Sequence, residues 1–119
     1  MDAKFNFITD VGHNLVRVKM AGFFSDEDVR RFAADYRSQL TQLSAPGHLT
    51  LVNITEMKIQ PQSVVRAFSS LVASPDVRSR RLAFVCSSTL ARLQAQRLTD
   101  REGVRFFEND YEAEGWLVG

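Results

Sequence analysis

Apolar runs typical of buried strands alternate with helical patterns along most of this chain, and this alternation limits the folds open to it. The runs "HLTLVNI", "RLAFVC" and "VRFF" predict strands, and apolar stripes at helical spacing separate them. Strands that alternate with helices pair in parallel through right-handed crossovers. The sequence therefore predicts an α/β domain built on a largely parallel sheet.

The N-terminal part predicts a β-hairpin. "KFNFIT" and "NLVRVKM" read as extended runs, and "DVGHN" between them suits a turn. The full order is then β-β-α-β-α-β-α-β-α, a five-stranded mixed sheet with an antiparallel N-terminal edge strand. With 119 residues, 45% of them apolar, we expect one domain over residues 1–119 whose core needs neither disulfide nor metal.

Four helices are predicted, beginning near Ser25, Pro61, Ser88 and Asp110. The first, from Ser25 to Leu43, has a serine N-cap followed by acidic residues that favour the positive end of the helix dipole. The third is expected to turn Leu90, Leu93 and Leu98 inward. Trp116 and Leu117 are expected to dock the fourth helix onto the core.

Charge and motifs argue against several classes of function. A net charge of +1 predicts no nucleic-acid partner, and the absence of a run of about 18 apolar residues predicts no stable membrane insertion. "MDAKFNF" lacks a signal-peptide layout and Cys86 stands alone, so we expect a cytoplasmic protein. No nucleophile, metal or nucleotide motif is visible, and His13 and His48 have no second ligand at metal spacing. We therefore expect a non-enzymatic protein without catalytic residues, metal or cofactor.

The order of elements and several local patterns resemble the SpoIIAA-like group, which includes the STAS domains and shares its fold with Sec14-type lipid-binding domains. The resemblance spans nearly the whole chain and rests on "MAGFFSDED", "LTLVNIT", "RRLAFVC" and "VRFFENDYEAEGWL". The closing strand with "EAEGWL" is most similar to small bacterial STAS/Sec14-like proteins. The resemblance implies a SpoIIAA-like fold and a bacterial regulatory or interaction module.

In STAS regulators the third strand ends in Asp or Asn, and a phosphorylatable serine opens the second helix within a "DSSG"-like element. The resemblance places Asn53 at the strand end and Ser63 at the phosphorylated position, with Pro61, Gln62 and Val64 replacing the other residues. Ser63 is thus a candidate phosphoacceptor, and a plain N-cap is the alternative. Asn53, Pro61 and Gln62 are candidate binding residues, although Asn53 could instead bond the adjoining loop.

Two phenylalanines, Phe23 and Phe107, have no place in the predicted core, so they are candidates to line an apolar pocket or an interface. Two functions remain open. The first is a regulatory or interaction module that binds a protein or small ligand near the junction of the third strand and second helix. The second is a Sec14-like carrier or sensor of an apolar small molecule or lipid.

Two surfaces invite further predictions. If the parallel strands lie in sequence order, all crossover helices cover one face of the sheet, and the other, partly apolar face predicts a homodimer. Seven arginines fall between residues 78 and 105. A basic patch for an anionic partner and a solvated surface are the alternatives there, and we expect the solvated surface.

Overall fold

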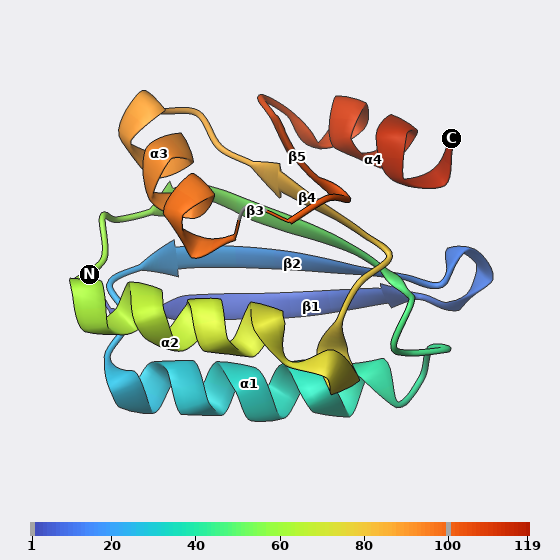
Figure 1. Cartoon of the computed structure of the whole chain (residues 1–119), viewed down its shortest axis with the longest axis horizontal. Helices are drawn as coiled ribbons and strands as arrows, with labels where there is room; N and C mark the ends of the chain where they lie inside the picture. The colour runs from blue at the N-terminus through green and yellow to red at the C-terminus, as the bar shows by residue number, and fades with distance from the viewer. Residues whose placement is uncertain (1, 100) are drawn as a thin grey trace.

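The five strands form one sheet in the order β1-β2-β3-β4-β5 (Figure 1). The computed structural model describes residues 2–99 and 101–119. Strand β1 pairs antiparallel with β2, and the other neighbours pair in parallel. This confirms the predicted α/β order and the mixed sheet. The strands are β1 (Lys4–Asp10), β2 (Leu15–Gly22), β3 (Leu49–Met57), β4 (Arg81–Val85) and β5 (Val104–Phe107), and the helices are α1 (Asp26–Leu40), α2 (Gln62–Ala73), α3 (Thr89–Leu98) and α4 (Asp110–Val118).

Helices cover both faces of this sheet. Helices α1, α2 and α3 pack on one face, where α1 and α2 run side by side, and α4 packs on the other (Figure 1). Alternate residues of β4 divide accordingly: Leu82 and Phe84 join the main core under α1–α3, whereas Ala83 and Val85 join a second core under α4. The α4 core contains Leu15, Leu49, Leu51, Ala83, Val85, Ala113 and Leu117.

The premise of the predicted homodimer is wrong, because α4 covers the second face over β3, β4 and β5. Beyond α4 this face is polar, since Arg17 Nη2 lies 2.6 Å from Glu114 Oε1 and Lys19 Nζ lies 3.0 Å from Glu56 Oε2. The parallel strands do lie in sequence order, the condition from which the placement of the crossover helices on one face follows. The homodimer itself stays a prediction, without the uncovered face that suggested it.

Helix α1 begins as its sequence predicts. Ser25 Oγ accepts from the Asp28 N–H at 3.1 Å, and the Asp28 carboxylate accepts from the Ser25 N–H at 2.9 Å. This reciprocal capping box satisfies two N–H groups that the helix leaves unpaired. The helix ends at Leu40, before the predicted Leu43, and a turn completes that stretch.

The predicted inward face of α3 is right for Leu98 and wrong for Leu90 and Leu93. Leu90 and Leu93 are 66% and 49% exposed. The residues that face the interior are Ala91, Gln94, Ala95 and Leu98. Their spacing of i, i+3, i+4 and i+7 places these four on one side of a helix, so the two leucines lie on the other side. Because two of the inward side chains are alanines, α3 approaches the sheet without filling the space beneath it.

Candidate ligand-binding cavity

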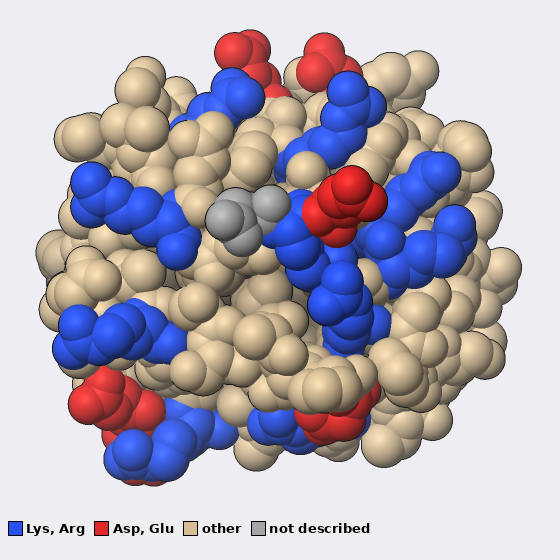
Figure 2. All heavy atoms as spheres, in the orientation of Figure 1, with Lys and Arg blue, Asp and Glu red and all other residues tan. Residues whose placement is uncertain are grey.

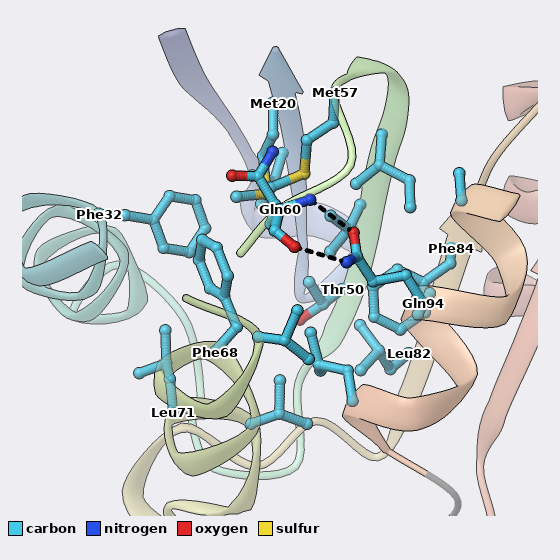
Figure 3. A pocket seen from close by; sticks show the side chains of 18 of the residues that line it. Met20, Phe32, Thr50, Met57, Gln60, Phe68, Leu71, Leu82, Phe84 and Gln94 are labelled. Atoms are coloured by element: carbon cyan, nitrogen blue, oxygen red, sulfur yellow. Dashed lines mark hydrogen bonds between the residues drawn. The ribbon is translucent and has the colours of Figure 1, made fainter. Parts of the chain in front are cut away.

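A cavity of about 100 Å³ lies inside the main core, between the sheet and the helices α1, α2 and α3 (Figure 3). Its walls are largely carbon. Phe32 and Phe68 line the side of α1 and α2, Leu82 and Phe84 line the side of β4, and the alanines of α3 lie opposite. The small inward side chains of α3 account for the open space. The cavity is therefore a consequence of the sequence of this helix.

Gln60 and Gln94 close one end of the cavity (Figure 3). Gln60 lies in the junction between β3 and α2, Gln94 lies on α3, and two hydrogen bonds join the Gln60 backbone to the Gln94 side chain. The Gln60 N–H donates to Gln94 Oε1 at 3.0 Å, and Gln94 Nε2 donates to the Gln60 carbonyl oxygen at 2.9 Å. The Gln60 side chain is buried too. Its Oε1 accepts from the Phe24 N–H at 2.8 Å, and its Nε2 donates to the Gly22 carbonyl oxygen at 2.9 Å. Gln60 thus ties the end of β2, the junction and α3 together.

The other end of the cavity carries hydroxyl groups. Tyr36, Thr50 and Ser79 all line the cavity. The Tyr36 hydroxyl lies 2.9 Å from Thr50 Oγ1, and Thr50 Oγ1 lies 2.6 Å from Ser79 Oγ. Behind them Tyr36 Oη lies 3.0 Å from Nε2 of His48, a residue with no exposed surface. This cluster gives an otherwise apolar cavity one polar end.

His48 is neutral at pH 7, because burial lowers the pKa of its imidazole to about 4. Its Nδ1 atom is buried without a hydrogen-bond partner in the part of the chain that the structure describes. A proton on Nδ1 would be an unpaired buried donor, whereas a proton on Nε2 is donated to Tyr36. The proton therefore belongs on Nε2, which fixes the direction of the first hydrogen bond in the cluster.

Arg101 lies at the hydroxyl end and lines the cavity. Its Nη2 donates to the Ser79 carbonyl oxygen at 3.2 Å, and its Nη1 donates to the Glu102 carbonyl at 3.1 Å. The turn that carries it sits close against the start of β4: Gly103 has φ +83°, and a Cβ there would lie 2.8 Å from the Arg80 carbonyl oxygen. Only glycine suits that position, so the turn holds Arg101 beside Ser79.

The predicted binding residue Asn53 lies elsewhere. Strand β3 continues to Met57, so Asn53 does not end the strand. Its Nδ2 donates to Asp110 Oδ1 at 2.9 Å, and its Oδ1 accepts from the N–H and hydroxyl of Thr55. Asn53 therefore joins β3 to the start of α4, on the face of the sheet away from the cavity. Among the described residues, the Asn53 side chain bonds Asp110 and Thr55 rather than the loop before α2.

Ser63, the candidate phosphoacceptor, is exposed near the start of α2 and lies in an open groove between α1 and α2 with Arg30 and Arg66. Pro61 occupies the N-cap position, and α2 has no side-chain cap hydrogen bond. The alternative interpretation of Ser63 as the N-cap is therefore wrong. The structure does not bring Ser63 and Asn53 together, and neither Pro61 nor the exposed Gln62 lines the cavity.

Ser63→Ala is expected to change the free energy of unfolding by less than about 0.5 kcal/mol, because the hydroxyl caps nothing. Ser25→Ala is the matched control and should lower it by about 1 kcal/mol, because Ser25 caps α1. Urea denaturation of both variants measures the difference. Equal losses would mean that Ser63 stabilises α2 by another contact.

The two unassigned phenylalanines also lie outside the cavity lining. Phe23 is 50% exposed beside the N-terminal segment, where its backbone forms an isolated β-bridge with that of Asp2. Phe107 packs on the α4 side, with its ring 5.7 Å from that of Trp116. The phenylalanines that do line the cavity are Phe32, Phe68 and Phe84, which the sequence assigns to the core. The sequence feature that could have indicated the cavity is the spacing of Ala91 and Ala95, which places two small side chains on the inward side of α3.

Within residues 2–99 and 101–119, no cluster of three His, Cys, Asp or Glu side chains could hold a metal ion. Cys86 is buried, and burial raises the pKa of its thiol. No helix in this part of the chain is long and apolar enough to cross a membrane.

A mixed sheet in sequence order, with three helices on one face and one on the other, defines the class of fold. A solved structure matches it with a TM-score of 0.73, covering 98% of this chain and 94% of that chain at 21% sequence identity. That structure is of an uncharacterized protein from the DUF3478 family with a SpoIIAA-like fold, from Shewanella loihica PV-4. This chain therefore has a SpoIIAA-like fold, as its sequence predicts. No family model and no curated protein matches the sequence.

Proposed function

We propose that this protein binds a small, mainly apolar molecule in the cavity of its main core and acts by binding rather than by catalysis. The observation that carries the proposal is the cavity itself, about 100 Å³ of largely apolar space in the centre of a small domain. Of the two functions predicted from the sequence, this supports the carrier or sensor of an apolar molecule.

An empty cavity of this kind destabilises a protein. At about 24 cal/mol per Å³, a volume of about 100 Å³ lowers stability by about 2 kcal/mol. Small domains have only about 5–15 kcal/mol of stability in total. Apolar walls do not hold water well, and an engineered apolar cavity of about 150 Å³ in another protein stays dry and binds benzene. A ring or chain of about six carbons is the size of ligand that suits this cavity.

The position of the cavity also fits a regulatory role. Its lining includes Met57, the last residue of β3, and three residues of the connection to α2, namely Lys58, Ile59 and Gln60. This is the junction where the sequence predicts binding, although the residues involved are different ones. Because Gln94 bonds the Gln60 backbone, a ligand that separates these two groups would move the junction relative to α3. A sensor would report occupancy to a partner through this movement.

Ala95→Met tests the proposal by filling the cavity. Ala95 lines the cavity and is 4% exposed, so a methionine there should occupy the space that a ligand needs. We expect 1-hexanol to bind saturably to the wild-type protein, refolded from denaturant so that the cavity starts empty. We expect Ala95→Met to weaken that binding at least tenfold, as measured by isothermal titration calorimetry.

Ala33→Met is the matched control, because Ala33 lies on α1 outside the cavity lining. It should bind 1-hexanol like the wild type. Circular dichroism of both variants checks that the fold is kept. An absence of saturable binding to the wild type, or equal binding by the two variants, would contradict the proposed function.

A further inference from the structure

The hydroxyl end of the cavity carries the positive charge of Arg101, which forms no ion pair with an acid among the described residues. Within residues 2–99 and 101–119, its hydrogen-bond acceptors are the Ser79 and Glu102 carbonyl oxygens, and its Nε is buried without a partner. Burial and the nearby Arg78 guanidinium both lower the pKa of Arg101, but an arginine stays charged at neutral pH. The positive charge of Arg78 thus adds to the free-energy cost of burying the Arg101 guanidinium. An anion at this end would offset both.

The hydroxyl cluster also has one proton to donate. With its proton on Nε2, His48 supplies one donor, and Tyr36, Thr50 and Ser79 supply one each. The short contacts that join these four groups are the His48–Tyr36, Tyr36–Thr50 and Thr50–Ser79 pairs, at 3.0, 2.9 and 2.6 Å. The Ser79–His48 contact is longer, at 3.4 Å, and shares the same Nε2. Four donors for three short contacts leave one hydroxyl proton available to an acceptor in the cavity.

These donors face a space whose remaining walls are mainly hydrocarbon. Arg101 bonds the Ser79 backbone, and Ser79, Thr50 and Tyr36 line the cavity with it. Lys58 is the other cation in the lining, but it is exposed and belongs to the end closed by Gln60 and Gln94. On the face drawn in Figure 2, Lys and Arg side chains outnumber Asp and Glu. Such a field raises the local concentration of anions.

We propose that the ligand is a compact organic acid, with its carboxylate at Arg101 and the hydroxyl cluster and its apolar body against Phe68, Leu82 and Phe84. This inference rests on the proposed function, because it specifies the chemistry of the molecule in the same cavity. A carboxylate accepts from a guanidinium and a hydroxyl together, and a charge-assisted hydrogen bond is about twice as strong as a neutral one. The apolar body of the ligand would fill the rest of the cavity, whose walls are mainly hydrocarbon.

The test compares hexanoate with 1-hexanol, two probes with the same carbon chain and different head groups. At pH 7 we expect the wild-type protein to bind hexanoate at least tenfold more tightly than 1-hexanol, by isothermal titration calorimetry. Arg101→Gln should weaken hexanoate binding at least tenfold and leave 1-hexanol binding within about twofold. Arg97→Gln is the matched control, because it removes the same charge from the exposed side of α3, outside the cavity lining, and should keep the preference.

The outcomes separate the two proposals. Equal or tighter binding of 1-hexanol by the wild type would overturn the carboxylate inference and leave the proposed function intact, and this comparison needs no variant to fold. Binding of neither probe would overturn both. A preference for hexanoate that survives Arg101→Gln, or that disappears in Arg97→Gln, would overturn the role of Arg101.

Discussion

Leu117→Ala is expected to lower the free energy of unfolding by about 3–4 kcal/mol. Leu117 is 1% exposed and packs in the α4 core against Leu15, Leu51 and Val85. This core is small, so few neighbours can move to fill the space that the lost methyl groups leave. Urea denaturation followed by circular dichroism measures the loss.

Val118→Ala is the control for this prediction. Val118 is the next residue of the same helix and is 47% exposed, so its truncation should cost less than about 1 kcal/mol. The contrast between adjacent positions separates core packing from helix propensity. Similar losses in the two variants would contradict the docking of α4 through Leu117.

Lowering the pH from about 6.5 to 4 is expected to reduce the free energy of unfolding by about 3 kcal/mol through His48 alone. The folded protein holds its imidazole neutral, with a pKa of about 4, whereas the ordinary pKa of histidine is 6.5. Between these values the unfolded chain binds more protons than the folded chain, so stability falls as the pH falls. Tyr36, whose hydroxyl lies 3.0 Å from His48 Nε2, stays neutral in this window, because burial raises its pKa above 10.

His48→Gln should remove most of the loss of unfolding free energy between pH 6.5 and 4. His13→Gln is the control and should show the same loss as the wild type, because His13 is exposed and pairs with Asp10. Urea denaturation at a series of pH values gives the comparison. Asp28 and Asp76 have lowered pKa values and contribute mainly below their ordinary pKa near 4, outside the main window. A wild-type stability that is flat between pH 6.5 and 4 would contradict the burial of a neutral His48.

The fold could be predicted because its signals are local. The serine and acids that begin α1 are adjacent in the chain, and each buried strand shows its apolar run within a few residues. Such signals do not depend on what packs against them. The hairpin and the start of each helix follow from patterns of this kind.

The site could not be predicted in the same way, because the elements that form it are distant in sequence. The hydroxyl cluster joins residues from three segments far apart in the chain, namely Tyr36, His48 with Thr50, and Ser79, and no short pattern marks them. In α3 the leucines suggested the wrong inward face, since hydrophobicity by itself favours large side chains over alanines. Asn53 was misplaced because β3 extends beyond it to Met57, past an irregular register with β2.

The placement of α4 has a consequence for how the protein is made. A ribosome synthesises all five strands before α4, so the nascent sheet has one face covered by crossover helices and the other bare. Leu15, Leu49 and Leu51 then stay in contact with solvent until the last helix emerges. Exposed apolar surface of this kind is where partly made chains aggregate and where chaperones bind. The docking of α4 is therefore the step that buries the leucines of the second face.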